Sequence, residues 1–219
     1  MRALPFTRRL VERDRFIVRE GEVPTSCGLL VKGFAIRQKV VRSGARQIVS
    51  FHFPGDFVDL QSCLLAINDH SVQALGPCEV AVVPKAAILA LIERRCSVGL
   101  TMWFDTLAEG AIFREWVVNV GRRNARARIA HLLCELAVRL ENEPRDGSVF
   151  ELPLTQEHIA DATGLTPVHT NRTIQILRKE GVISLSGGRL TVHDWDALRS
   201  LGDFSQLYLH RDAARPQRG

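Results

Sequence analysis

The hydrophobic pattern of residues 16–84 consists of short β-prone runs separated by turn residues. The turns are marked at Gly21, Gly33, Ser43-Gly44 and Pro54-Gly55-Asp56. Short strands at regular spacing with such turn signals are typical of a small antiparallel roll or barrel. The run KAAILALIE, residues 85–93, then predicts a short helix after the roll.

A longer helix, predicted over residues 98–120, is apolar on more sides than a helix that covers a single sheet. One stripe at helical spacing holds Leu100, Phe104, Leu107, Ala111 and Val118, and Trp103 and Trp116 broaden the apolar surface of the helix. We expect this stripe to pack against its own copy in a homodimer. The alternative is that the helix simply packs on the roll. Charged residues within the helix exclude a lipid-spanning role.

Residues 154–183 predict two helices joined by a tight turn. Thr155 is placed to cap the first helix, and Gly164 and Leu165 form the turn. Thr166 caps the second helix, with Pro167 at its first position, where the missing N–H costs nothing. Two helices joined by a short glycine-containing turn are typical of a helix-turn-helix.

The second of these helices has one apolar face and one polar face. Thr170, Ile174 and Leu177 form the predicted buried stripe. The opposite face carries no carboxylate and holds Val168, His169, Asn171, Arg172, Gln175 and Lys179. The Arg, Gln, Asn and His side chains have donors and acceptors that match base edges. For an isolated helix a solvated polar face is the simpler interpretation; the helix-turn-helix context favours DNA recognition.

Further caps and turns complete this part of the chain. Residues 182–192 contain two β-prone runs around Ser186-Gly187-Gly188, which predicts a hairpin with Arg189 at its tip. Such a hairpin after a helix-turn-helix is a wing. Asn124 caps a helix over residues 125–141, residues 143–153 are predicted as a linker, and Asp194 caps a final helix.

These elements define an α+β chain. We expect a β-roll sensor domain over residues 1–97, resembling a cyclic-nucleotide-binding jelly roll. A dimerisation helix follows over residues 98–121, and a winged helix-turn-helix DNA-binding domain over residues 122–219.

Composition refines this picture only slightly. The chain has 219 residues and a formal net charge of +5, which mildly favours an anionic partner. A local cluster, GRRNARAR at residues 121–128, holds four arginines and no acid. The five scattered cysteines do not form a disulfide framework, so we expect the protein to be located in the reducing cytoplasm. No apolar run is long enough to predict a membrane span.

The order of roll, long apolar helix and winged helix-turn-helix resembles the Crp/Fnr family of bacterial transcription regulators. The resemblance covers nearly the whole chain. It is carried by REGE (19–22), LLVKG (29–33), GARQI (44–48), FPGDF (53–57), HSVQAL (70–75), RRNARARIAHLL (122–133) and TPVHTNRTIQILRKEGVI (166–183).

The resemblance implies a homodimer on a roughly palindromic operator of double-stranded DNA, with RNA polymerase as a further partner. The family's common Glu-x-x-Ser-Arg signature is altered, because Val168 and Asn171 replace its Glu and Ser, while Arg172 matches. Arg172 is the expected guanine reader, and His169 and Gln175 are candidate base contacts. Asn171 reads a base or a phosphate. Thr155 and Thr166 lie at helix N-termini and are suited to contact DNA phosphates. Lys179 and Arg189 complete the set of expected DNA-binding residues.

The chain departs from the family's pattern at the sites of its two best-known cofactors. The cyclic AMP site uses a Gly-Glu pair and an Arg-Ser/Thr pair, where this chain has VDLQSC (58–63) and His70-Ser71. An iron–sulfur cluster needs an N-terminal group of cysteines, whereas Cys27 stands alone. We therefore expect neither cofactor. An unidentified effector or redox cue at the roll and activity without any ligand both remain open.

Three weaker constellations of possible site residues remain in the sequence. His131 and Cys134 have metal-ligand spacing, but no second pair completes a tetrahedral site. A cupin-like metal centre, and with it a remote enzyme hypothesis, would draw on His52, Asp56, Asp59 and His70. The aspartate of FPGDF more simply bonds backbone amides. Cys63 or Cys78 could sense redox state, although a buried, inert thiol is the simpler interpretation. We therefore expect that the protein binds no metal and is not an enzyme.

Overall fold

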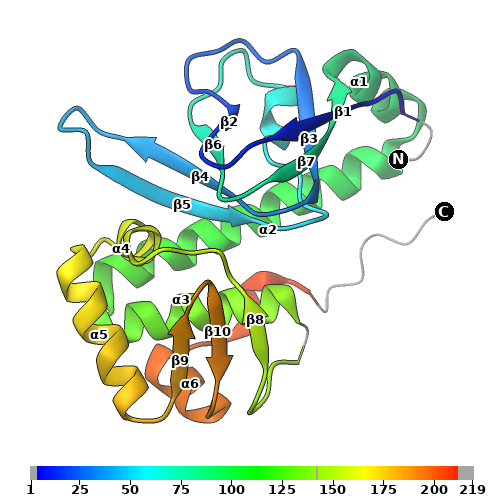
Figure 1. The fold of residues 1–219 in the computed structure, drawn as a ribbon. Coiled ribbons are helices and arrows are strands. Elements are labelled where there is room, and N and C mark those ends of the chain that lie inside the picture. The colour runs from blue at the N-terminus through cyan, green and yellow to red at the C-terminus, as the bar shows by residue number, and fades with distance from the viewer. Residues whose placement is uncertain (1–3, 142, 212–219) are drawn as a thin grey trace. The chain divides into compact units, whose positions relative to one another are not determined.

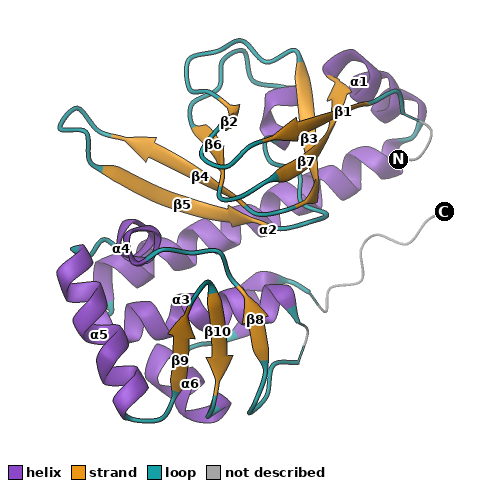
Figure 2. Ribbon diagram, viewed as in Figure 1, coloured by secondary structure: helices purple, strands orange, loops and turns teal. Residues whose placement is uncertain are grey.

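The computed structural model describes residues 4–141 and 143–211. The chain forms two compact units, one of residues 1–111 with 210–219 and the other of residues 112–209. The division falls inside the long helix α2 (Cys96–Arg122), after Ala111. The helix was predicted at residues 98–120, as a segment separate from both domains. Figures 1 and 2 show the elements of each unit.

The first unit is a roll of two antiparallel sheets (Figure 2). One sheet has the order β1-β7-β3 and consists of β1 (Thr7–Val11), β7 (Cys78–Pro84) and β3 (Ser26–Lys32). The other has the order β2-β6-β4-β5 and consists of β2 (Phe16–Val18), β6 (Ser71–Ala74), β4 (Ala35–Val40) and β5 (Arg46–His52). The roll predicted from the turn spacing is therefore present.

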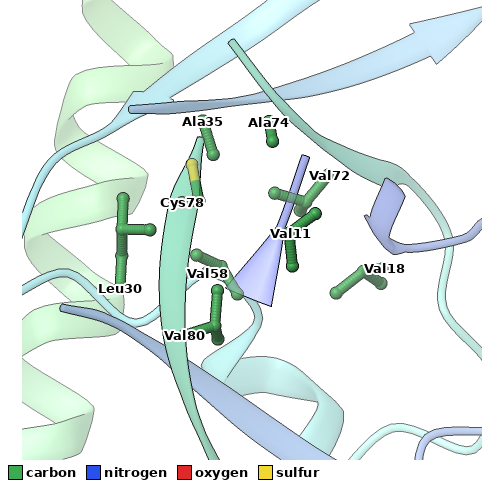
Figure 3. Close-up of a cluster of buried hydrophobic side chains, with 9 residues drawn as sticks. All are labelled: Val11, Val18, Leu30, Ala35, Val58, Val72, Ala74, Cys78 and Val80. Atoms are coloured by element: carbon green, nitrogen blue, oxygen red, sulfur yellow. The ribbon is translucent and has the colours of Figure 1, made fainter. Parts of the chain in front are cut away.

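Aliphatic side chains from both sheets fill the roll (Figure 3). Leu30 of β3 lies opposite Val80 of β7 in the register of the first sheet, and both side chains are fully buried. Val72 and Ala74 contribute from the second sheet. Residues two apart in a strand point to the same face, which explains why these short runs supply one continuous core.

The first strand, β1, was missed because the roll was predicted to begin near Phe16. Its sequence TRRLV has two adjacent arginines, and only Val11 is buried. The strand lies at the edge of its sheet, where it pairs only with β7 through contacts such as Val11 with Cys78. Charged edge strands lack the alternating pattern that predicts a half-buried strand.

Two short helical elements complete the first unit. Helix α1 (Lys85–Arg94) follows β7 as predicted, and the 3-10 helix η1 (Leu60–Cys63) follows the FPGDF turn. A second hydrophobic cluster joins Cys27, Cys63, Val83 and Ile88.

The second unit surrounds helix α3 (Ala125–Leu140), whose central residues are buried. Around it lie α4 (Gln156–Thr163), α5 (Pro167–Lys179), α6 (Trp195–Gly202) and the 3-10 helix η2 (Gln206–Leu209). Asn124 caps α3 by accepting from the Ala127 amide, and Asp194 caps α6 by accepting from the Ala197 amide. Both caps were predicted.

The wing is a three-stranded sheet. The predicted hairpin is formed by β9 (Ile183–Ser186) and β10 (Arg189–Val192), and β8 (Val149–Glu151) pairs with the other side of β10. The prediction of a plain linker over residues 143–153 was therefore wrong at β8. A three-residue strand has no detectable period, and its partner lies about 40 residues away in sequence.

Gly202 of α6 lies close against the backbone of α3. A Cβ atom at this position would lie 2.7 Å from the His131 amide nitrogen and 2.9 Å from the His131 Cα. Both are backbone atoms of α3, so the helix cannot yield by rotating a side chain.

We expect Gly202→Ala to lower the free energy of unfolding of the second unit by about 3 kcal/mol, the upper part of the range for overpacking. Denaturant unfolding followed by tryptophan fluorescence measures the change. Gly121→Ala is the control, because nothing lies within 4 Å of its added Cβ in the last turn of α2. Equal stability of the Gly202 variant and the wild type would contradict the close approach.

Candidate nucleic-acid interface

The helix-turn-helix is formed by α4 and α5, and each helix start is fixed by a capping threonine. The Thr155 hydroxyl accepts from the His158 amide at 3.2 Å, and His158 Nδ1 accepts from the Thr155 amide at 3.2 Å. This reciprocal pair is a capping box with histidine in place of the usual glutamate. Helix α4 ends at Gly164, whose φ of 64° is the left-handed conformation that glycine adopts without a Cβ penalty.

Helix α5 begins at Pro167, and its N-cap is Thr166. The Thr166 hydroxyl accepts from the His169 amide at 3.2 Å, and Pro167 occupies the first turn. Thr170, Ile174 and Leu177 are buried as predicted, and Thr173 adds to this face. The Thr173 hydroxyl donates back to the His169 carbonyl at 2.9 Å, so the polar atom of this buried residue is satisfied within the helix.

The outward face of α5 has the composition that the sequence predicted. The predicted DNA-contacting residues of the helix are all exposed: His169, Asn171, Arg172, Gln175 and Lys179. Val168 is exposed on the same face. These six side chains include no carboxylate, and Ile176 is a second exposed aliphatic residue of the helix. Glu180 follows the helix and forms an ion pair with Arg126.

The other predicted contact residues lie at helix starts and on the wing. Thr155 and Thr166 are exposed at the N-termini of α4 and α5, where backbone N–H groups and the helix dipole favour anions. Arg189 is the first residue of β10. Its guanidinium donates to Glu151 of β8 at 2.8 and 3.0 Å in a pair with both side chains exposed.

The arginine cluster at residues 121–128 is largely engaged within the second unit. Arg123 donates to Glu115 at 2.7 Å, and Arg126 pairs with Glu180. Arg128 donates to the Arg123 carbonyl at 2.8 Å and to the Thr163 carbonyl at 3.1 Å, close to the end of α4. Three of the four arginines therefore hold the domain together, and only Arg122 is exposed.

A buried polar network in the second unit joins α3 to residues of α2, α6 and η2. Glu135 is fully buried and accepts from the Trp116 indole at 2.9 Å and the Tyr208 hydroxyl at 2.8 Å. His131 has its Nδ1 3.1 Å from the Gly202 carbonyl and its Nε2 3.1 Å from the Tyr208 hydroxyl. Trp116 was predicted to broaden the apolar surface of the long helix; it belongs to this core instead.

Burial sets the ionisation of this network. Desolvation lowers the pKa of His131 from 6.5 to about 4, and nearby Arg123 acts in the same direction. Desolvation raises the pKa of Glu135. Both shifts favour the uncharged forms, as expected for groups removed from water.

The His131 shift predicts a pH dependence of stability. Below pH 6.5 the unfolded chain takes up a proton on His131 that the folded chain refuses until about pH 4. The stabilisation from the neutral imidazole is therefore present above pH 6.5 and is lost as the pH falls. We expect the stability of the wild type relative to His131→Gln to shrink by about 2 kcal/mol between pH 7.5 and pH 5. Denaturant unfolding at both pH values tests this, and a pH-independent difference would contradict it.

The remaining candidate residues in the roll also have structural partners. Asp56 accepts from the Phe53 amide at 2.9 Å, as predicted for the FPGDF turn, and Asp59 accepts from the Gly28 amide at 3.0 Å. His70 lies 2.7 Å from Asp69. Within residues 4–141 and 143–211, no three His, Cys, Asp or Glu side chains are grouped as a metal site would require.

The two thiols considered as redox sensors are both buried. Cys78 donates to the Phe34 carbonyl at 3.2 Å, and desolvation raises its pKa. Cys63 hydrogen-bonds to the thiol of Cys27, and this bond lowers the pKa of Cys63. The partnership between Cys27 and Cys63, which are 36 positions apart, could not be read from the sequence.

Helix α2 exposes apolar side chains in both units. In the first unit Leu100, Trp103 and Leu107 are 49%, 63% and 56% exposed. Phe104 is half-buried, with its ring edge-on to His210, and Ala111 is buried. In the second unit Val117 and Val118 are exposed. Trp103 and Val117 thus belong to the exposed surface, although neither was among the residues predicted for a dimer interface.

The fold and this site define a DNA-binding transcription regulator. A family model described as a Crp-like helix-turn-helix domain matches residues 127–201, and one described as a cyclic nucleotide-binding domain matches residues 8–95. The chain belongs to the Crp/Fnr family. Among the described residues, no helix combines the length and apolar character needed to cross a bilayer.

Comparison with individual proteins supports the same family assignment. The chain is 30% identical over 195 residues to a probable transcriptional activator of Rhizobium leguminosarum bv. viciae, covering 89% of this chain and 80% of that protein. It is 30% identical over 185 residues to transcriptional activator protein FnrL of Cereibacter sphaeroides, covering 83% and 74%. The structure of FixK2 from Bradyrhizobium japonicum has the same fold, with a TM-score of 0.84 at 24% identity over 92% and 100% of the two chains. The first two of these relatives are named as transcriptional activators.

Proposed function

We propose that the protein is a homodimer that binds a roughly palindromic operator, with one α5 helix in each of two successive major grooves. The observation that carries the proposal is the exposed, carboxylate-free face of α5 with Arg172 near its centre. The helix is held from behind by its buried stripe, so its outward side chains need not serve the core.

The contact residues divide by chemistry into base readers and phosphate ligands. Arg172 pairs in a bidentate manner with guanine O6 and N7, and His169, Asn171 and Gln175 face neighbouring base edges. Phosphates are bound by the remaining set: Thr155, Thr166, Lys179 and Arg189. The exposed ion pair between Arg189 and Glu151 is weak in water, so exchange of the carboxylate for a phosphate costs little.

Helix α2 supplies the dimer interface in this proposal. Leu100, Trp103 and Leu107 are spaced by three and four residues, the repeat of an a/d seam in a coiled coil. Large side chains that remain exposed at this spacing are suited to pack against the same helix of a second copy. Because each copy carries one recognition helix, two-fold symmetry of the protein matches the symmetry of the operator.

Two regulatory arrangements of the roll are compatible with its contacts. Buried Arg37 of β4 donates to the Val58 carbonyl at 3.0 Å and forms an ion pair with Glu109 of α2. This cation is neutralised by the chain's own carboxylate, which favours a roll that is active without a ligand. The other arrangement is control by an unidentified effector or by oxidation of a thiol such as Cys63.

We propose that neither cyclic AMP nor an iron–sulfur cluster is the cofactor. His70 stands where the family's phosphate-binding arginine would be, and the Ser71 hydroxyl already accepts from the Glu20 amide at 3.0 Å. Unchanged thermal stability in excess cyclic AMP is the expected result. The protein would act in the cytoplasm with RNA polymerase as its further partner.

Selection from a random pool of double-stranded DNA, with reduced protein and no added ligand, tests the proposal. Recovery of a palindrome with half-sites about one helical turn apart supports a dimeric reader that needs no effector. Recovery only after treatment with peroxide or a cell extract supports control at the roll. A folded protein that selects no sequence under any of these conditions would contradict the proposal.

A further inference from the structure

Val168 stands apart on the DNA-facing side of α5. It lies in the first turn of the helix, is 73% exposed, and has polar or cationic neighbours on the same face. The buried stripe of the helix is complete without it, because Thr170, Ile174 and Leu177 fill those positions. Its side chain therefore has no role in the core.

We propose that Val168 is a specificity-determining residue that contacts the C5-methyl group of a thymine in each half-site. The inference rests on the proposed function and deepens it, because it names one of the bases that the helix reads.

The chemistry of the major groove supports thymine over the other bases. An isopropyl group neither donates nor accepts a hydrogen bond, and thymine alone among the four bases presents a methyl group there. Against guanine, adenine or cytosine the same side chain would cover a donor or acceptor and leave it unpaired. Val168 thus favours thymine by attraction and disfavours the other bases by desolvation.

The position of Val168 restricts where this thymine lies. Val168 and Arg172 are four residues apart, so they lie on the same side of the helix about 6 Å apart along its axis. Base pairs rise about 3.4 Å each. The thymine is therefore expected within about two base pairs of the guanine that Arg172 reads. A β-branched side chain has one preferred rotamer in a helix, so little freedom is lost on contact.

Single-methyl deletion in the DNA tests the inference. In the operator recovered by selection, each thymine is replaced in turn by deoxyuridine, which differs only by the missing methyl group. For the wild type we expect one thymine per half-site at which this change weakens binding about fourfold, and about fifteenfold when both half-sites are changed. For Val168→Ala we expect less than a twofold effect at the same thymine.

Ile176→Ala is the matched control, since it truncates another exposed β-branched residue of α5. This variant should retain the wild-type response to deoxyuridine. An operator without a sensitive thymine, or one whose sensitivity persists in Val168→Ala, would overturn the role of Val168 while leaving the operator-binding function intact. A protein that selects no operator would overturn the proposed function and this inference with it.

Discussion

Arg172→Ala is expected to weaken binding to the selected operator by about 1–3 kcal/mol per half-site and to relax the preference for guanine at one base pair. The cause is the loss of two hydrogen bonds to guanine from a side chain that the structure leaves exposed on α5. Binding curves on the operator, on single-base variants and on random DNA measure both effects.

A matched control separates base reading from charge. Arg178→Ala removes the same charge from the last turn of the same helix, at a position rotated away from Arg172. We expect it to weaken binding to operator and to random DNA by similar, small factors. Equal losses on both kinds of DNA for Arg172→Ala as well would show that this arginine contacts only phosphate.

Leu107→Glu is expected to weaken dimer association at least a hundredfold. In the proposed interface two carboxylates, one from each copy, would replace two leucines and lose their hydration without a partner, at a cost of about 3 kcal/mol or more. Sedimentation equilibrium measures the association directly. Operator affinity should fall in parallel, because a monomer engages only one half-site.

The control for this variant is Leu64→Glu. Leu64 is as apolar and more exposed than Leu107, and it lies in the loop after η1 rather than on α2. This variant should remain a dimer. An unchanged mass for Leu107→Glu, with the fold intact by circular dichroism, would refute the assignment of α2 as the dimer interface.

The local features of the DNA-binding unit were predictable because they depend on neighbours in sequence. Thr155 and Thr166 cap helices whose amides lie three residues further on. Gly164 provides the left-handed turn, and the stripe of Thr170, Ile174 and Leu177 follows directly from the helical period. The exposed face of α5 is the complement of that stripe.

Other features depended on partners far away in sequence. Trp116 was predicted to add to the apolar surface of the long helix. In the structure it is buried, and its indole donates a hydrogen bond to Glu135 of α3. Arg126 belongs to the basic cluster of residues 121–128, and its ion-pair partner Glu180 lies 54 positions away in the sequence. Strands β1 and β8 carry too few alternating residues to be recognised alone, and each is defined by the strand beside it.

The sequence by itself determined the order of roll, long helix and winged helix-turn-helix, the helix caps, the buried and exposed sides of α5, and the resemblance to the Crp/Fnr family. The tertiary structure decided which charges are already neutralised within each unit, which cysteines meet, and which apolar residues of α2 remain exposed. The physical reason is the range of the interactions. Capping, turns and amphipathic periods act within a few residues, whereas ion pairs, strand pairing and burial depend on what the folded chain brings together.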